Sequence, residues 1–451
     1  MVEIRISRQG AERVQLGHPW VYRSDIMNSG GAAPGQVVRV LDGRNNRLGA
    51  AHYSSSSQIA LRMLPREVPV TDTAFFRRLI TRAQKFRDQV VHDTEAYRLV
   101  HAEADLLPAL IVDRYGEYFV IQTLNQGMDA SKHNIVAALT ELYSPLGIVE
   151  RNEAAVRVKE NLPQESGVLA GDVPAEIELA INGLRMGVDL LHGQKTGLFL
   201  DQRENYRAAR QYGHGTALDC FTYNGAFALH LAQAYEWVEA VDSSGPSIEH
   251  ARRNARRNGL DNIQFIESDV FDFLQQAAAR ERHFDMVVLD PPAFAKSRKH
   301  LPAAARGYKE INLKALRLLK RDGILITCSC SHHFTEAELL EVVAAASIDA
   351  GVTLRVLERR TQAKDHPILA GVSADGFTSS SSLYMNHPIS DAATVLLTGR
   401  IDGVEQAEPL AWTHIRDGQR VFYTSLGGPG DFDQEAFRKL LKNAIEWSLE
   451  R

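Results

Sequence analysis

The chain contains little cysteine and no long apolar run. Three cysteines in 451 residues are too few for a disulfide framework, and they indicate a reducing, cytoplasmic environment. No apolar run approaches the roughly 18 residues that a membrane helix needs. The first ten residues also lack the apolar stretch of a secretory signal. We therefore expect a cytoplasmic protein without a membrane partner.

An excess of positive charge is also absent, because the formal net charge is −5. A negative total does not exclude nucleic acid, since phosphate contacts need clustered Lys and Arg rather than a basic total. Two such clusters occur. Each could be an ordinary solvent-exposed surface, or it could bind the phosphates of a nucleic acid. They are ARRNARRNGL, with Arg252, Arg253, Arg256 and Arg257, and AKSRKH, with Lys296, Arg298 and Lys299.

The sequence pattern divides the chain into four parts. Residues 1–70 show short β-type runs broken by Gly, Pro and Asn, which predicts a small β-barrel. Residues 71–188 combine helices with a strand hairpin around Gly116 and predict an α+β domain. In residues 189–378, apolar strands alternate with helices, which predicts a Rossmann-like α/β fold with a parallel sheet. Residues 379–451 form a separate C-terminal part.

Glycine is scarce in the loop after the first strand of this predicted sheet. The segment LDCFTYNGAFALH lacks a G-x-G-x-x-G fingerprint, which disfavours hydride transfer, although Gly225 would let a ligand approach the backbone. Asp219, Asp242 and Asp269 lie at the ends of three successive strands, where such sheets bind ligands. A single acid there is more often a helix cap or a polar turn. Three in succession favour a nucleoside ligand, with Asp242 on the ribose and Asp269 near the adenine.

The segment VVLDPPAF places Asp290 directly after a buried strand. Two prolines remove backbone donors and stiffen the turn, so the carboxylate and the carbonyl groups remain to face whatever occupies the pocket. A flat, polar base edge fits this arrangement. The alternative is an ordinary Pro-rich strand exit.

Two of the three cysteines stand in ILITCSCSHH, which leaves several interpretations open. In a strand, Cys328 and Cys330 would share one face, with Cys330 nearer the C-terminal edge. Two thiols at that spacing do not complete a zinc site, and a mixed site would need His332 or His333. A thiolate nucleophile suits the mouth of a ligand-binding sheet, while simple buried cysteines are the competing interpretation.

Together these stretches resemble one known family. Over residues 1 to about 370 the chain is similar to bacterial 23S ribosomal RNA (cytosine-5) methyltransferases, which are class I S-adenosylmethionine enzymes with an N-terminal PUA domain. The resemblance implies a PUA β-barrel, an α+β central domain and a Rossmann-like methyltransferase sheet. The matching stretches are GHPWVYRSDI, LLPALIVDRYGEYFVIQ, GQKTGLFLDQRENY, LDCFTYNGAFALH, DPPAFAKS, TCSCSHH and ERRTQAKDHPIL.

The resemblance also implies roles for single residues. Cys330 would add to C6 of the target cytosine as a thiolate, Asp290 would hydrogen-bond the pyrimidine edge, and Cys328 has no assigned role. The implied methyl donor is S-adenosylmethionine and the implied partner is 23S rRNA; no metal is implied, and a homodimer is left open. The residues assigned to the cofactor are Gln202, Asp219, Phe221, Asn224, Gly225, Asp242, Ser243, Asp269, Val270 and Asp290.

The segment with which the family closes its sheet is missing here. Instead, residues 383–449 resemble the C-terminal end of ThuA-like (trehalose-utilisation) proteins. This tail could supply a substitute closing strand, ATVLLTG, with a hairpin and a final helix; it could be a loosely packed appendage; or it could mark a fusion that impairs activity. One alternative function is methylation of a guanine amino group, because D-P-P-F turns also serve exocyclic amines; Cys330 would then be dispensable. The other is RNA binding without catalysis, if the altered sheet is inactive.

Overall fold

The chain folds into two compact units. The first comprises residues 1–175, 189–198 and 361–451, and the second comprises residues 176–188 and 199–360. No helix within the described ranges is long and apolar enough to cross a membrane. The computed structural model describes residues 1–65, 70–295, 298–331, 333–360, 394–399, 408–416, 419–426, 431 and 434–449.

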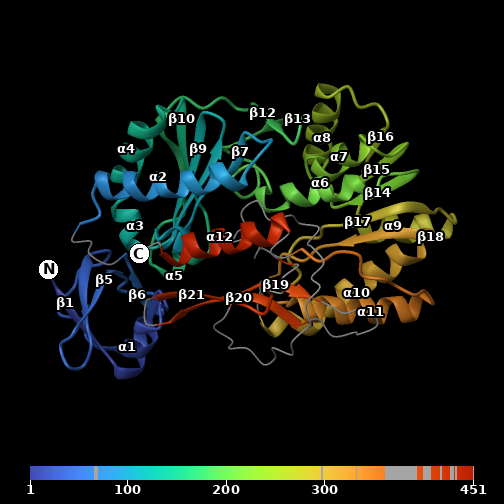
Figure 1. Ribbon diagram of the computed structural model, residues 1–451. Coiled ribbons are helices and arrows are strands. Elements are labelled where there is room, and N and C mark those ends of the chain that lie inside the picture. The colour runs from blue at the N-terminus through green and yellow to red at the C-terminus, as the bar shows by residue number, and fades with distance from the viewer. Residues whose placement is uncertain are drawn as a thin grey trace. The chain divides into compact units, whose positions relative to one another are not determined.

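The N-terminal domain is a six-stranded sheet with one helix packed on it (Figure 1). Its elements are β1 (Glu3–Ile6), α1 (Arg8–Gln15), β2 (Trp20–Tyr22), β3 (Ile26–Asn28), β4 (Val37–Leu41), β5 (Arg47–Tyr53) and β6 (Ile59–Met63). The strand order is β2-β6-β5-β4-β1-β3. Alternation along β1 buries Ile4 and Ile6, as a sheet with one core face requires. Helix α1, which the β-type pattern did not predict, begins after Ser7, whose hydroxyl accepts the Gly10 amide.

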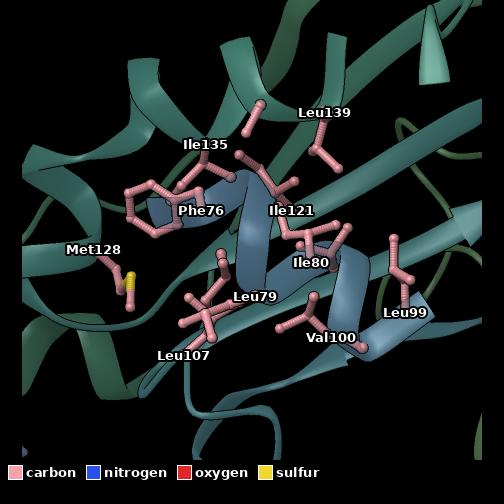
Figure 2. Packing of buried hydrophobic residues seen from close by; sticks show 14 of the residues in the cluster. Phe76, Leu79, Ile80, Leu99, Val100, Leu107, Ile121, Met128, Ile135 and Leu139 are labelled. Carbon is pink, nitrogen blue, oxygen red and sulfur yellow. The ribbon is translucent and has the colours of Figure 1, made fainter. Parts of the chain in front are cut away.

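The central domain is a five-stranded sheet covered by two helices. Its elements are α2 (Thr73–Val90), β7 (Ala96–His101), β8 (Leu110–Tyr115), β9 (Tyr118–Thr123), α3 (Gln126–Ala130), α4 (Lys132–Tyr143), β10 (Gly147–Asn152), α5 (Val156–Lys159) and β11 (Glu165–Gly171). The strand order is β11-β10-β9-β8-β7, and β8 and β9 form the hairpin predicted around Gly116. In Figure 2, Phe76, Leu79 and Ile80 of α2 pack into the same apolar core as Val100 of β7.

The second unit contains the predicted parallel sheet. Its elements are β12 (Ile177–Ile181), β13 (Leu184–Val188), α6 (Arg203–Gln211), β14 (Thr216–Cys220), α7 (Ala226–Ala232), β15 (Trp237–Asp242), α8 (Gly245–Arg257), β16 (Ile263–Glu267), α9 (Val270–Ala279), β17 (Phe284–Leu289), α10 (Leu301–Arg317), β18 (Leu319–Thr327) and α11 (Glu336–Ala350). The order is β16-β15-β14-β17-β18, and all four neighbouring pairs are parallel. The order reverses direction at β14, which is the place where open α/β sheets bind ligands.

The C-terminal part forms a sheet of its own. Its described elements are β19 (Thr394–Gly399), β20 (Glu408–Arg416), β21 (Gln419–Thr424) and α12 (Glu435–Leu449). Strand β19, the candidate closing strand, pairs with β20, whereas β18 pairs with β17 alone among the described strands. The closing-strand prediction is therefore wrong, because β19 pairs in antiparallel fashion with β20, which is nearer in sequence than β18. The predicted hairpin and final helix are confirmed, and Leu396, Phe437, Leu440 and Trp447 form their core.

Candidate functional site

The strand register brings the predicted residues to one edge of the parallel sheet. Leu289 of β17 lies opposite both Cys220 of β14 and Thr327 of β18. Asp290 and Cys328 therefore follow neighbouring strands at the same level, and the Cys328 N–H donates to the Leu289 carbonyl at 2.8 Å. This alignment puts a carboxylate and a thiol beside the loop that follows β14.

Asp219 is a fully buried acid on β14. Its Oδ2 accepts the Thr222 hydroxyl at 2.5 Å and the Ala228 amide at 3.0 Å, while its buried Oδ1 has no partner. Burial, aided by the charge of Asp290, raises the pKa of Asp219 to about 7 against the lowering effect of the Thr222 hydrogen bond. A buried acceptor oxygen without a donor costs free energy, so this position fits a ligand that brings a donor or a positive charge.

The loop after β14 has an unusual backbone. Phe221 and Tyr223 both have positive φ, 64° and 51°, which is uncommon for large side chains. Gly225 has φ 86°, and a Cβ there would lie 3.0 Å from the Cβ of Ala251 on α8. The glycine thus permits α7 to pack closely on α8, and the ligand approach suggested by the sequence stays a prediction. Asn224 is buried in the same loop.

The acids on the next two strands hold backbone amides. The carboxylate of Asp242 accepts the N–H groups of Tyr223 and Ser244, each at 2.9 Å, and its remaining lone pairs can still accept a ligand hydroxyl. Asp269 caps α9, because its Oδ1 accepts two backbone N–H groups. Its expected contact with adenine remains a prediction. Of the adjacent cofactor candidates, Ser243 is exposed and the Val270 side chain is buried.

Asp290 is oriented by the start of α6. Gln202 donates through Nε2 to Asp290 Oδ1 at 2.9 Å, and Asn205 donates to Gln202 Oε1 at 2.6 Å. Tyr206 is buried beside this pair, and burial together with the charge of Asp290 raises its pKa. The sequence analysis found Gln202 but missed Asn205 and Tyr206, although their positions three and four residues after Gln202 put them on the same helix face.

The three thiols have different environments. Strand β18 ends at Thr327, so the prediction that Cys328 and Cys330 share one strand face is wrong. Burial raises the pKa of the Cys220 and Cys328 thiols well above the ordinary range, and the charge of Asp290 adds to the effect at Cys328. Cys330 is the exposed thiol of the three, and its Sγ lies 3.7 Å from the carbonyl oxygen of Pro291.

A buried tyrosine holds the segment that carries Cys330. The hydroxyl of Tyr308, on α10, lies 3.0 Å from the hydroxyls of both Ser329 and Ser331. Ser331 in turn accepts the N–H of Ala295 from the loop after β17 at 3.2 Å. The sequence analysis did not identify Tyr308, because its partners lie more than twenty residues away along the chain.

Three of the four arginines of α8 are paired with acids of the same unit. Arg252 pairs with Glu249 at 2.5 Å. Arg253 pairs with Glu176 at 3.3 Å, and Arg257 also contacts Glu176. The two pairs with Glu176 connect α8 to the segment that leads into β12. A role of the α8 arginines in phosphate binding stays a prediction.

Metal ligands do not gather anywhere in the described part of the chain, where no group of three His, Cys, Asp or Glu side chains could hold an ion. His332, one candidate for a mixed cysteine–histidine site, lies outside the described residues, as does Lys296 of the second basic cluster. Lys299 of that cluster is exposed.

Comparison with known families matches three segments of the chain. Residues 4–66 match a PUA-like domain, residues 213–370 match a methyltransferase domain, and residues 331–448 match a trehalose-utilisation (ThuA) family. The ThuA match starts earlier than the 383–449 range expected from the sequence and overlaps the methyltransferase match. Both expected resemblances are confirmed.

Whole proteins and solved structures give the same result. The chain is 41% identical over 362 residues to the ribosomal RNA large subunit methyltransferase I of Tolumonas auensis, covering 78% of this chain and 91% of that protein. It is 36% identical over 375 residues to the protein of the same name from Yersinia pseudotuberculosis, and the match covers 81% of this chain and 95% of that protein. A SAM-dependent methyltransferase structure from Streptococcus mutans shares the fold, with a TM-score of 0.65 and 23% sequence identity. The match covers 77% of this chain and 90% of that structure. The chain therefore belongs to the ribosomal RNA large subunit methyltransferase I family of S-adenosylmethionine-dependent methyltransferases.

Proposed function

We propose that the chain methylates C5 of a cytosine in 23S rRNA through a covalent bond between Cys330 and C6 of the base. The observation that carries this proposal is the contrast among the three thiols. Cys220 is buried and Cys328 is half-buried, and burial raises the pKa of both thiols, whereas Cys330 is exposed beside the turn that carries Asp290. The names of the relatives support an rRNA substrate.

Cys330 makes C5 of the base reactive. C5 of cytosine is a weak nucleophile, and addition of a thiolate at C6 converts the ring into an enamine whose electron pair lies at C5. S-adenosylmethionine, when bound, supplies an electrophilic methyl group. After C5 has gained the methyl group, a general base takes the C5 proton. The electron pair of that C–H bond re-forms the C5–C6 double bond, the C6–S bond breaks, and Cys330 leaves as the thiolate. The target base must be unstacked to reach the site, as in other base-modifying enzymes.

Asp290 orients the base. Carboxylates accept hydrogen bonds from the exocyclic amino group of cytosine, and Gln202 fixes the Asp290 carboxylate through its hydrogen bond to Oδ1. Asn205 prevents Gln202 from turning, because it donates to Gln202 Oε1. We infer that the carboxylate held in this orientation faces the pyrimidine edge.

The cofactor would be held by the residues at the ends of the first three strands. The unpartnered Oδ1 of Asp219 fits the positive charge of the methionine part of S-adenosylmethionine, and Asp242 fits a ribose. The loop with Phe221, Asn224 and Gly225 would enclose the ligand between these acids, with Ser243, Asp269 and Val270 on the adenosine side.

The first test compares wild type with Cys330→Ala in methyl transfer from labelled S-adenosylmethionine to protein-free 23S rRNA. We expect the wild type to make 5-methylcytosine and the variant to retain less than roughly a thousandth of the rate, because a nucleophile has no substitute. Cofactor affinity, measured by calorimetry, should stay unchanged, since the site assigned to the cofactor lies on other strands.

Cys328→Ala is the matched control, because it removes a thiol from the same segment. RNA that carries 5-fluorocytidine sharpens the comparison, since it lacks the C5 proton whose loss precedes thiolate release. A covalent protein–RNA adduct should form with wild type and Cys328→Ala and should be missing with Cys330→Ala. Methylation that survives in Cys330→Ala, with methylguanine as product, would instead support methylation of a guanine amino group.

A further inference from the structure

The hairpin of β12 and β13 lies beside α8 (Figure 1). Among the described strands it forms a two-stranded sheet apart from the parallel sheet. Asn258 of α8 accepts the Arg185 N–H at 2.8 Å and donates to the Arg185 carbonyl at 2.7 Å. Asn254, one helical turn earlier, accepts the Gly187 N–H at 2.8 Å. These contacts join β13 to α8, although the partners are 73 and 67 residues apart in the sequence.

The side chain of Asn254 also reaches the loop after β14. Its Nδ2 donates to the Asn224 carbonyl at 3.1 Å, while its Oδ1 accepts the Gly187 N–H and, at 2.9 Å, a guanidinium N–H of Arg257. The side chain is fully buried, and a buried amide needs such partners. One side chain therefore connects the hairpin, α8 and the loop whose Asn224 is assigned to the cofactor.

The turn of the same hairpin contacts the start of α6. Asn182 donates through Nδ2 to the Arg203 carbonyl at 3.0 Å, and this nitrogen also lies 3.3 Å from Nε2 of His230 on α7. Nδ1 of His230 lies 2.7 Å from a backbone carbonyl of its own helix, which can only accept, so Nε2 accepts from Asn182. Burial lowers the pKa of His230 to about 4, and the ring is neutral at neutral pH. Because Gln202 directly precedes Arg203, the turn holds the residue that orients Asp290.

The turn by itself would also explain an asparagine at position 182. Asn182 and Gly183 have φ values of 51° and 82°, and Asn-Gly is a favoured pair for such a two-residue hairpin turn. The turn does not require a side chain at the first position, however, because glycine adopts the same φ. Replacing Asn182 by glycine therefore separates its side-chain contacts from the turn.

We propose that the β12–β13 hairpin positions both parts of the candidate site, with Asn254 holding the cofactor loop and Asn182 holding the start of α6. Both are positioning residues, because each acts through the backbone carbonyl of a neighbouring residue. The proposal rests on the proposed function, which assigns Asn224 to the cofactor and Asp290 to the base.

The cofactor part is tested with Asn254→Asp in the full-length chain. The carboxylate keeps the acceptor contacts of Oδ1 but cannot donate to the Asn224 carbonyl. We expect the affinity for S-adenosylhomocysteine, measured by calorimetry, to fall about three- to tenfold, which is the loss expected from one hydrogen bond. Asn258→Asp is the matched control on the same helix, because its side chain contacts Arg185 of the hairpin instead of the loop. It should bind within about twofold of wild type.

The base part is tested with Asn182→Gly. We expect kcat for methyl transfer at saturating cofactor to fall about tenfold, because small displacements of the group that orients the base are costly. The affinity of this variant for S-adenosylhomocysteine should stay within about twofold of wild type. Asn161→Gly is the matched control, since Asn161 has φ 54°, is exposed and belongs to the first unit. Its kcat should equal that of wild type.

Equal cofactor affinities of Asn254→Asp and Asn258→Asp would overturn the proposal, and so would equal kcat values of Asn182→Gly and Asn161→Gly. A parallel loss of affinity and kcat in both test variants, with earlier thermal unfolding, would show that the hairpin only stabilises the fold. Asn254→Ala introduces no charge and replaces Asn254→Asp if that variant does not fold. If wild type makes no 5-methylcytosine, the proposed reaction fails, while the affinities for S-adenosylhomocysteine still decide the role of Asn254.

Discussion

At the scale of single residues, the position of Cys330 depends on Tyr308. The tyrosine hydroxyl contacts the two serines that flank the nucleophile. We expect Tyr308→Phe to lower kcat for methyl transfer by roughly tenfold to a hundredfold, because small displacements of a reacting atom are costly. KM for RNA and cofactor affinity should change little, since Tyr308 contacts neither proposed binding site.

Tyr235→Phe provides the control for this prediction. Tyr235 is also buried, and its hydroxyl donates to the Tyr212 carbonyl at 3.1 Å, away from Cys330. Steady-state kinetics and thermal unfolding of both variants separate positioning from stability. Equal losses of kcat in the two variants would show that Tyr308 acts only through the fold.

At the scale of elements, the contact of α3 with β5 depends on Gly127. A Cβ at this position would overlap the ring of His52, which is buried and whose pKa is lowered to about 4 by burial and by the charge of Arg62. We expect Gly127→Ala to lower the free energy of unfolding by about 1–3 kcal/mol, as overpacking does. Urea unfolding followed by circular dichroism measures this change.

Gly167→Ala is the matched substitution, because nothing lies within 4 Å of a Cβ there. It should leave stability nearly unchanged. Neither variant should alter cofactor affinity, since both glycines belong to the first unit. A Gly127→Ala protein as stable as wild type would mean that the α3–β5 contact can relax without cost.

At the scale of the whole molecule, the tail is predicted to be dispensable for cofactor binding. Strands β19 to β21 and α12 have a core of their own, and no described tail strand pairs with β18. We expect a chain ending at residue 378 to bind S-adenosylhomocysteine within about twofold of the full-length affinity, measured by calorimetry. A chain ending at residue 318, which lacks β18 and Cys330, is the negative control for methylation. Loss of binding on removal of the tail alone would show that the tail stabilises the sheet.

Much of the fold could be predicted from the sequence, because the signals are local. Apolar runs that alternate with helical patterns predicted the parallel sheet, and turn residues around Gly116 predicted the β8–β9 hairpin. The candidate site followed from strand ends that carry Asp242, Asp290 and Cys330, since parallel strands bring their carboxyl ends to one edge. The family resemblance then supplied the reaction.

The tertiary structure decided what depends on partners distant along the chain. The family resemblance had already assigned the nucleophile to Cys330 rather than Cys328. The structure adds a physical contrast, because burial and the charge of Asp290 raise the pKa of Cys328 while Cys330 is exposed, and the pKa of a thiol is set by its surroundings. Arg252, Arg253 and Arg257 of α8 proved to be paired with acids, which the spacing of the arginines did not predict. The tail strand paired within its own sheet rather than with β18. Strand pairing and ion pairing join residues that are far apart in the sequence, so local patterns do not specify them. The periodicity of the sequence determined which helices and strands form, and tertiary packing determined which residues each of them contacts.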